Sequence, residues 1–214
     1  MATLSPRQGY HHGNLQATFI AAAKRMVRER GAEHLSLRAV AAQVGVSPSA
    51  VYHYFPDKDA LIAGVGNSLF DELADWQARE VSKHVGIGAE DARARFRALG
   101  QAYFDLAMRE PNLFRLMFGA FCSIEEDDGS ELRRDESKAW RLLQSSLDDL
   151  LQTGAMSPTM RPYGEILAWS AVHGASALIV EGHLPAEIFA SLLDALNISL
   201  GITTEADSRK ARKK

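Results

Sequence analysis

The chain of 214 residues has little of several features that mark common protein classes. It holds a single cysteine, Cys122, so it cannot form an internal disulfide, which suits a reducing cytoplasm. No segment approaches the apolar run of about 20 residues that a transmembrane helix needs, and residues 1–12 lack the apolar core of a secretion signal. We therefore expect a cytoplasmic protein with no membrane partner.

The motifs of common enzymes are also missing. The chain has no glycine loop that would cradle phosphates, no nucleophile elbow and no pair of metal-binding histidines on one helix. The acidic stretch 125–131 lacks the alternating ligands and the central glycine of a calcium loop, so we interpret it as a solvated loop. Cys122 lies in an apolar segment that favours a packed core residue, with a sensor thiol as the alternative. The sequence therefore predicts no enzyme, no cofactor and no metal site.

Charge is distributed unevenly along the chain. The formal net charge is only −3, but residues 1–60 carry +3, residues 61–208 carry −11, and residues 209–214 add five basic side chains. A basic head on an acidic body is what a protein that binds a polyanion would show.

Residues 36–58 are the most informative segment, with the sequence SLRAVAAQVGVSPSAVYHYFPDK. Ser36 is an N-cap, and the apolar spacing after it predicts a helix over 36–44. Gly45 stops that helix, and Ser47 followed by Pro48 starts a second one, which we expect to run to about residue 54. Two helices joined by so short a turn form a helix-turn-helix, whose second helix enters the DNA major groove.

The rest of the chain has helical spacing throughout and no alternating strand pattern. We predict an all-α fold: a three-helix helix-turn-helix head and a larger helical body for ligand binding and dimerisation. The predicted domains are an arm and head over 1–57, a body over 58–202 and a disordered tail over 203–214. The predicted helices cover 14–30, 36–44, 48–54, 58–83, 91–109, 111–122, 130–153, 161–183 and 186–200.

The helix-turn-helix segment resembles the DNA-reading segment of the TetR family of transcriptional regulators. The matching positions are Val46, Ser47, Val51, Tyr52, Tyr54, Phe55, Lys58 and Leu61. The segments 9–15 and 109–119, together with Trp169, His173 and Gly174, resemble one subgroup of that family with a Trp-x-x-x-His-Gly pattern. The resemblance covers nearly the whole chain and implies double-stranded operator DNA as a partner.

The resemblance also implies roles for residues of the head. Tyr52, Tyr54 and Lys58 would hold phosphates, helped by Ser36 or Ser47 at helix N-termini. Ser49 and His53 lie where base edges are met. Two arginines lie outside this core set: Arg38 could reach a base or a phosphate, and Arg7 on the arm could enter a minor groove. The predicted DNA-binding residues are Arg7, Ser36, Arg38, Ser47, Ser49, Tyr52, His53, Tyr54 and Lys58.

The last two predicted helices, 161–183 and 186–200, are more apolar than packing on one side requires. They also contain several small residues that permit close helix approach, so we expect them to pair with a second copy as a four-helix interface. The alternative is a hairpin buried within one subunit.

The family fold implies a cavity in the body for an unknown small-molecule effector. We expect its lining among the aromatic and methionine residues of the body, together with one polar residue, His173. The alternative for each is a plain core position, or for His173 an interface contact. The candidates are Tyr103, Phe104, Met108, Phe114, Met117, Phe118, Phe121, Trp140, Trp169 and His173.

These observations together predict a homodimeric DNA-binding regulator that responds to a ligand, and we favour a repressor released from its operator by a small molecule. Two alternatives remain open from the sequence. One is a transcriptional activator, and the other is a helical dimer that binds a small molecule without regulating DNA.

Overall fold

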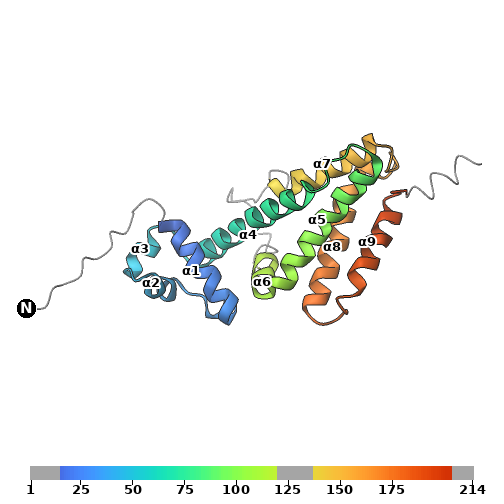
Figure 1. Cartoon of the computed structure of the whole chain (residues 1–214). Helices are drawn as coiled ribbons and strands as arrows, with labels where there is room; N and C mark the ends of the chain where they lie inside the picture. Colours follow the sequence, from blue (N-terminus) through green and yellow to red (C-terminus); the bar gives the residue numbers. More distant parts are fainter. Residues whose placement is uncertain (1–14, 120–136, 204–214) are drawn as a thin grey trace, which may run out of the picture. The chain divides into compact units, whose positions relative to one another are not determined.

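The structure is a computed structural model that describes residues 15–119 and 137–203 (Figure 1). Within these ranges the chain forms helices and no strand, apart from one isolated bridge between Met156 and Ile202. The contacts divide the chain into two units between Val65 and Gly66. We call the first unit the head and the second the body. The all-α class predicted from the sequence is confirmed.

Among its described residues, the head contains three complete helices and a short turn. Ser36 caps the second helix by accepting a hydrogen bond from the Ala39 N–H at 3.2 Å. Gly45 ends that helix in the left-handed conformation at φ 80°, as glycine permits. Both were predicted and both are confirmed. The elements are α1 (Leu15–Arg30), the 3₁₀ turn η1 (Ala32–His34), α2 (Leu37–Val44) and α3 (Pro48–Tyr52).

The third helix is shorter than predicted. It ends at Tyr52 rather than at about residue 54, and His53 and Tyr54 form a turn. The difference lies at a frayed helix end, because the His53 N–H still donates to the Ser49 carbonyl at 3.1 Å with helical spacing. Phe55 is then buried in the core of the head beside Val51, which closes the end of the helix onto that core.

Helix α4 (Lys58–Val81) belongs to both units. Asp57 caps it by accepting a hydrogen bond from the Ala60 N–H at 2.8 Å. Leu61 and Val65 are fully buried, so the first two turns of α4 belong to the core of the head. The division between the units therefore falls inside α4, whereas the sequence suggested residue 57 as the end of the head.

In the described residues of the body, five further helices follow, of which α5 contacts α7 and α8, and α8 contacts α9 (Figure 1). Gly100 allows α5 a close approach, because a Cβ there would lie 3.0 Å from the Leu193 Cδ2 of α9. None of the helices in the described ranges has both the length and the apolarity to cross a membrane. The bounds are α5 (Ala89–Arg109), α6 (Pro111–Gly119), α7 (Lys138–Gln152), α8 (Gly164–Val180) and α9 (Ile188–Ser199).

Two predicted helices of the body begin later than the sequence suggested. Helix α7 begins at Lys138, where the Ser137 side chain caps it by accepting from the Trp140 N–H; the predicted start at 130 lies outside the described residues. Helix α8 begins at Gly164 because residues 161–163 form the 3₁₀ turn η3 around Pro162. It ends at Val180, just before Gly182 adopts a positive φ of 75°.

Candidate functional site

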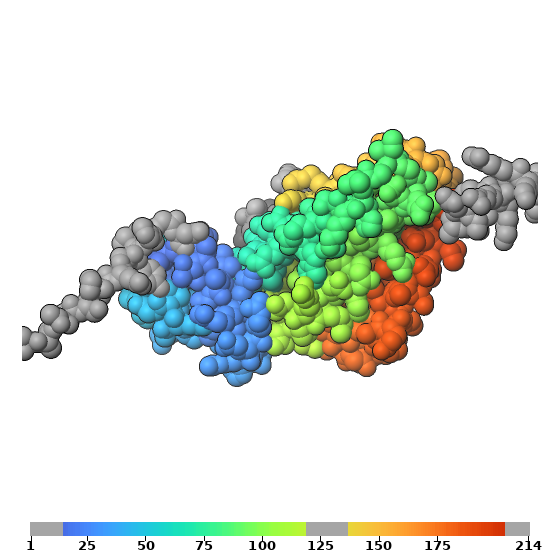
Figure 2. Space-filling model, in the orientation of Figure 1, coloured from blue at the N-terminus to red at the C-terminus, as the bar shows by residue number. Residues whose placement is uncertain are grey.

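The first candidate site is the polar surface of α2 and α3 in the head (the cyan region in Figure 2). Ser36, Arg38 and Ser49 are exposed. The Ser47 and Ser49 hydroxyls lie 2.9 Å apart and hydrogen bond to each other. Because each hydroxyl both donates and accepts, this pair keeps further hydrogen-bonding capacity toward solvent or a ligand.

The tyrosines of this surface are unusually exposed for large aromatic side chains. Tyr52 is 48% exposed, and Tyr54 packs edge-on against Phe19 of α1 with ring centroids 5.7 Å apart. His53 is also exposed and lies edge-on to Tyr54, at 5.3 Å. All three aromatic residues are therefore accessible from solvent, and Tyr54 is held in place by its contact with Phe19.

The last two predicted DNA-contacting residues are Lys58, which the structure describes, and Arg7, which lies outside the described ranges. Lys58 is half-buried, and its ammonium donates a hydrogen bond to the Ala32 carbonyl of η1 at 3.2 Å. An ammonium carries three N–H groups, so this bond leaves others for a phosphate.

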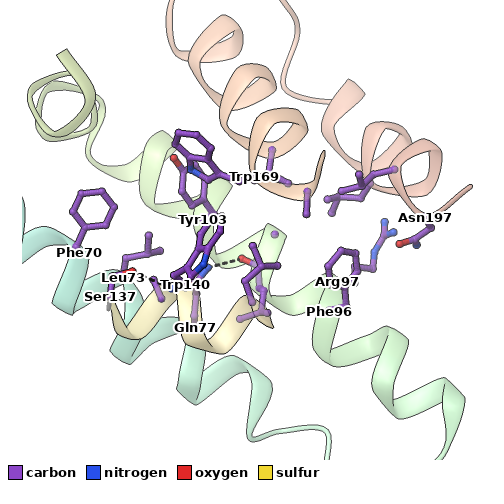
Figure 3. Close-up of a pocket in the computed structure, with 18 residues that line it drawn as sticks. Phe70, Leu73, Gln77, Phe96, Arg97, Tyr103, Ser137, Trp140, Trp169 and Asn197 are labelled. Carbon is purple, nitrogen blue, oxygen red and sulfur yellow. Dashed lines mark hydrogen bonds between the residues drawn. The ribbon is translucent and has the colours of Figure 1, made fainter. Parts of the chain in front are cut away.

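The second candidate site is a cavity of about 130 Å³ inside the body (Figure 3). Side chains of five helices form its wall, and most of them are apolar. Three predicted lining residues, Tyr103, Trp140 and Trp169, lie in this wall. The others are Phe70, Leu73, Gln77, Phe96, Arg97, Leu99, Gly100, Ser137, Ala139, Leu143, Ala168, Val172, Leu193, Leu196 and Asn197.

The remaining predicted lining residues are not in this wall. Phe104 stacks on Phe189 of α9 with ring centroids 4.0 Å apart, and Met108 is exposed. Phe114 and Met117 are buried in the core of the body. Aromatic and methionine content alone does not reveal which side of α5 or α6 faces the cavity. Phe118 and His173 belong to the cluster described next, and Phe121 lies outside the described residues.

An aromatic cluster adjoins the cavity through Tyr103 and Trp169, which belong to both. His173 stacks on Trp169 at 5.5 Å and lies 4.3 Å from the Phe118 ring, between centroids. Its Nδ1 lies 2.9 Å from the Tyr103 hydroxyl, within hydrogen-bond distance. Burial lowers the pKa of His173 and raises the pKa of Tyr103 well above its ordinary value. Both side chains are therefore neutral near pH 7.

Four polar residues of the cavity wall were not predicted, namely Gln77, Arg97, Ser137 and Asn197. The Gln77 side chain, only 7% exposed, donates from Nε2 to the Leu99 carbonyl at 3.1 Å. Arg97 pairs with Asp194 at 2.6 Å. The sequence held a signal for Gln77, because it follows Leu69 and Leu73 at intervals of four along α4 and so continues an inward-facing stripe.

The described ranges contain no group of three histidine, cysteine or acidic residues placed to hold a metal ion. The acidic stretch 125–131 and Cys122 lie outside these ranges. The site chemistry therefore consists of a polar, partly aromatic surface on the head and an apolar cavity in the body.

Comparison with known proteins assigns both units to one family. Residues 19–65 match the family described as "Bacterial regulatory proteins, tetR family". Residues 96–196 match "Tetracyclin repressor-like, C-terminal domain". The chain belongs to the TetR family. The match over 19–65 includes α2, α3 and the turn between them, and the second match includes most of the cavity wall.

Individual relatives agree with this TetR-family assignment. The chain is 32% identical over 98 residues to the nucleoid occlusion factor SlmA of Pasteurella multocida, covering 46% of this chain and 47% of the relative. It is 33% identical over 90 residues to the HTH-type transcriptional regulator BetI of Burkholderia thailandensis, covering 42% and 44%. The matches thus span about half the length of these curated relatives.

A solved structure extends the likeness over most of the fold. A protein of unknown function from Rhodococcus sp. RHA1 aligns with 91% of this chain and 100% of its own, at a TM-score of 0.73 and 27% identity. The likeness therefore includes the helical body as well as the helix-turn-helix head.

Proposed function

We propose that this TetR-family protein is a DNA-binding transcriptional regulator, and specifically a repressor that a small molecule releases from its operator. The observation that carries the proposal is the helix-turn-helix within residues 19–65, whose second helix keeps Ser49 and Tyr52 exposed and is followed by the exposed His53. A protein with this role acts where the chromosome is, so we infer a cytoplasmic location.

The exposed residues of the head have distinct proposed roles on DNA. The hydroxyls of Tyr52 and Tyr54 and the ammonium of Lys58 contact phosphates, and Ser36 and Ser47 assist at the starts of α2 and α3. Three residues remain for sequence reading or additional phosphate contacts: Ser49, His53 and Arg38. Arg7 is proposed for the minor groove.

A second copy of the chain completes the proposed regulator, because paired reading helices recognise paired half-sites about one turn of DNA apart. Helix α8 is apolar on two sides. Ala168 and Ala175 are buried within the body, whereas Leu167 and Leu178 are exposed. A Cβ at Gly174 would meet nothing within 4 Å, so the helix can be approached closely there. We propose that this outer face, with Ile198 of α9, is the dimer interface.

The cavity is the proposed effector site, and α4 is the proposed connection to the head. Phe70, Leu73 and Gln77 of α4 line the cavity, and Leu61 of the same helix is buried in the core of the head. A ligand that shifts α4 can change the arrangement of the heads, but only by as much as it prefers the arrangement that does not bind DNA. We also propose that the chain belongs to the subgroup of TetR regulators with a Trp-x-x-x-His-Gly pattern, because Trp169, His173 and Gly174 fit that pattern.

Deleting the gene and measuring transcripts of its neighbours tests the repressor proposal. We expect the transcripts to rise, and purified protein to retard DNA from its own upstream region in a gel. Transcripts that fall on deletion would indicate an activator. Unchanged transcripts, with no retarded DNA, would leave a helical dimer that binds a small molecule without regulating DNA.

A further inference from the structure

The cavity wall contains an unpaired hydrogen-bond acceptor. Gln77 uses its Nε2 for the Leu99 carbonyl, which fixes the orientation of the amide. Its Oε1 is buried and has no hydrogen-bond partner among the described residues. A buried polar atom without a hydrogen-bond partner destabilises the fold. We therefore expect such an atom in a native protein to bond to a molecule outside the chain. Of the buried unpaired side-chain atoms in the described ranges, only this one belongs to a residue of the cavity wall.

The charges of the wall favour an uncharged ligand. The wall contains no acidic residue and one basic residue, Arg97. The guanidinium of Arg97 is already neutralised by Asp194 at 2.6 Å, and both side chains reach solvent. Moving a charged group from water into apolar surroundings without a partner is costly. The wall therefore offers little compensation for a carboxylate, and an ammonium would find no carboxylate there to pair with.

The size and composition of the wall favour a compact ring. The cavity measures about 130 Å³, and an apolar protein cavity of about 150 Å³ holds benzene. Phe70, Phe96, Tyr103, Trp140 and Trp169 contribute aromatic rings, and Figure 3 shows Tyr103, Trp140 and Gln77 approaching the same space from three helices. Aromatic side chains of this kind pack edge-on or offset against a planar partner.

We propose that the effector is a neutral ring-sized molecule with one O–H or N–H donor, bound so that the donor contacts Gln77 Oε1. This inference depends on the proposed function only for the regulatory role of the cavity. The preference for a neutral donor-bearing ring follows from the wall itself.

Phenol and toluene are matched probes, because they differ in whether the ring carries a hydroxyl donor or a methyl group. Titration calorimetry with the full chain measures both, with benzoate as the anionic comparison. We expect phenol to bind at least as tightly as toluene, although toluene is the more apolar, and benzoate to bind about tenfold more weakly than phenol or worse. Tenfold tighter binding of toluene than of phenol, tighter binding of benzoate, or binding of neither ring would overturn the proposal.

Gln77→Met keeps the volume of the side chain and removes the acceptor. We expect it to weaken phenol about tenfold and to leave toluene within about twofold of its original affinity. An equal effect on both probes would overturn the role of Oε1. Ala168→Leu, which fills the cavity from α8, is the second variant. It should abolish binding of both probes, and retained binding would place the ligand elsewhere.

Operator binding separates this inference from the proposed function. If phenol and toluene show the expected pattern and DNA affinity does not change with phenol bound, the ligand class stands and the regulatory role of the cavity fails. If phenol releases DNA equally from native protein and from Gln77→Met, regulation stands and the assignment of Oε1 fails.

Discussion

At the scale of single residues, Tyr52 and Tyr54 of the head are exposed to solvent, and their hydroxyls are the proposed phosphate contacts. Tyr52 supplies the sharpest test, because Tyr52→Phe deletes one hydroxyl from a ring that is 48% exposed. A lost hydrogen bond to phosphate should weaken DNA binding by about 0.5–3 kcal/mol per subunit with little change in Tm. Anisotropy titration and thermal unfolding measure the two effects.

Tyr163→Phe is the matched control, since Tyr163 of the body is 59% exposed. It should change neither DNA affinity nor Tm. A loss of stability in Tyr52→Phe with normal DNA binding would mean that the Tyr52 hydroxyl serves the fold and not the DNA.

Lys58 has a structural bond as well as a proposed phosphate contact, and salt dependence distinguishes the two. Each phosphate that a protein neutralises steepens the plot of log affinity against log salt by about 0.9. Lys58→Met should flatten this slope by about that amount per subunit. The control Lys83→Met removes a cation that pairs with Glu80 in the body and should leave the slope unchanged. If both variants keep the original slope, the only role left for Lys58 is its bond to the Ala32 carbonyl.

His173 makes the stability of the body depend on pH. Burial lowers its pKa, so the folded protein binds fewer protons than the unfolded chain. Its neighbour Tyr103 stays neutral because burial raises that pKa. The stabilisation linked to the lowered pKa of His173 is complete above the unfolded pKa of about 6.5 and is lost as the pH falls below that value. Thermal unfolding from pH 7.5 to 5 should show a falling Tm. His173→Gln should flatten the curve of Tm against pH. The control His183→Gln changes an exposed histidine and should leave the curve as it is. Identical curves for the native protein and both variants would refute the prediction.

At the scale of helices, α8 shows why the choice of interface variant matters. Small residues along this helix suggested the interface, but Ala175 is buried inside the body, so Ala175→Arg would disrupt the fold itself. Leu178 lies on the outer face and is 45% exposed. Leu178→Arg should place charges in the proposed contact between copies and give monomers by sedimentation, because burying an unpaired charge costs several kcal/mol.

Val85→Arg is the control for charge alone, since Val85 lies in the loop after α4 and is 87% exposed. It should remain dimeric. A dimeric Leu178→Arg variant with normal DNA binding would move the interface away from the outer face of α8.

At the scale of the whole molecule, the sequence predicted the helices well where local chemistry decides them. Ser36 and Gly45 act at helix ends as expected, because capping depends on neighbouring residues alone. The cavity was harder to predict, since it depends on how five helices face one another. Trp140 and Trp169 were found by residue type, whereas Phe104 was assigned to the cavity and stacks on Phe189 instead.

Gln77 shows what sequence reading missed. Its position on the inward stripe of α4 could be inferred from the sequence. That its Oε1 has no partner follows only from the structure, in which Nε2 donates to the Leu99 carbonyl. The division inside α4 has a similar cause, because burial of Val65 depends on packing that lies outside the local sequence.

The most direct test of the central claim is the ratio of specific to non-specific DNA affinity, measured by fluorescence anisotropy at one fixed salt concentration. The full chain is titrated into a duplex from upstream of its own gene and into a shuffled duplex of equal length and composition. A sequence-reading regulator should prefer the upstream duplex by about a thousandfold or more. Equal affinities for the two duplexes would contradict the account, because the head would then hold phosphates without reading bases.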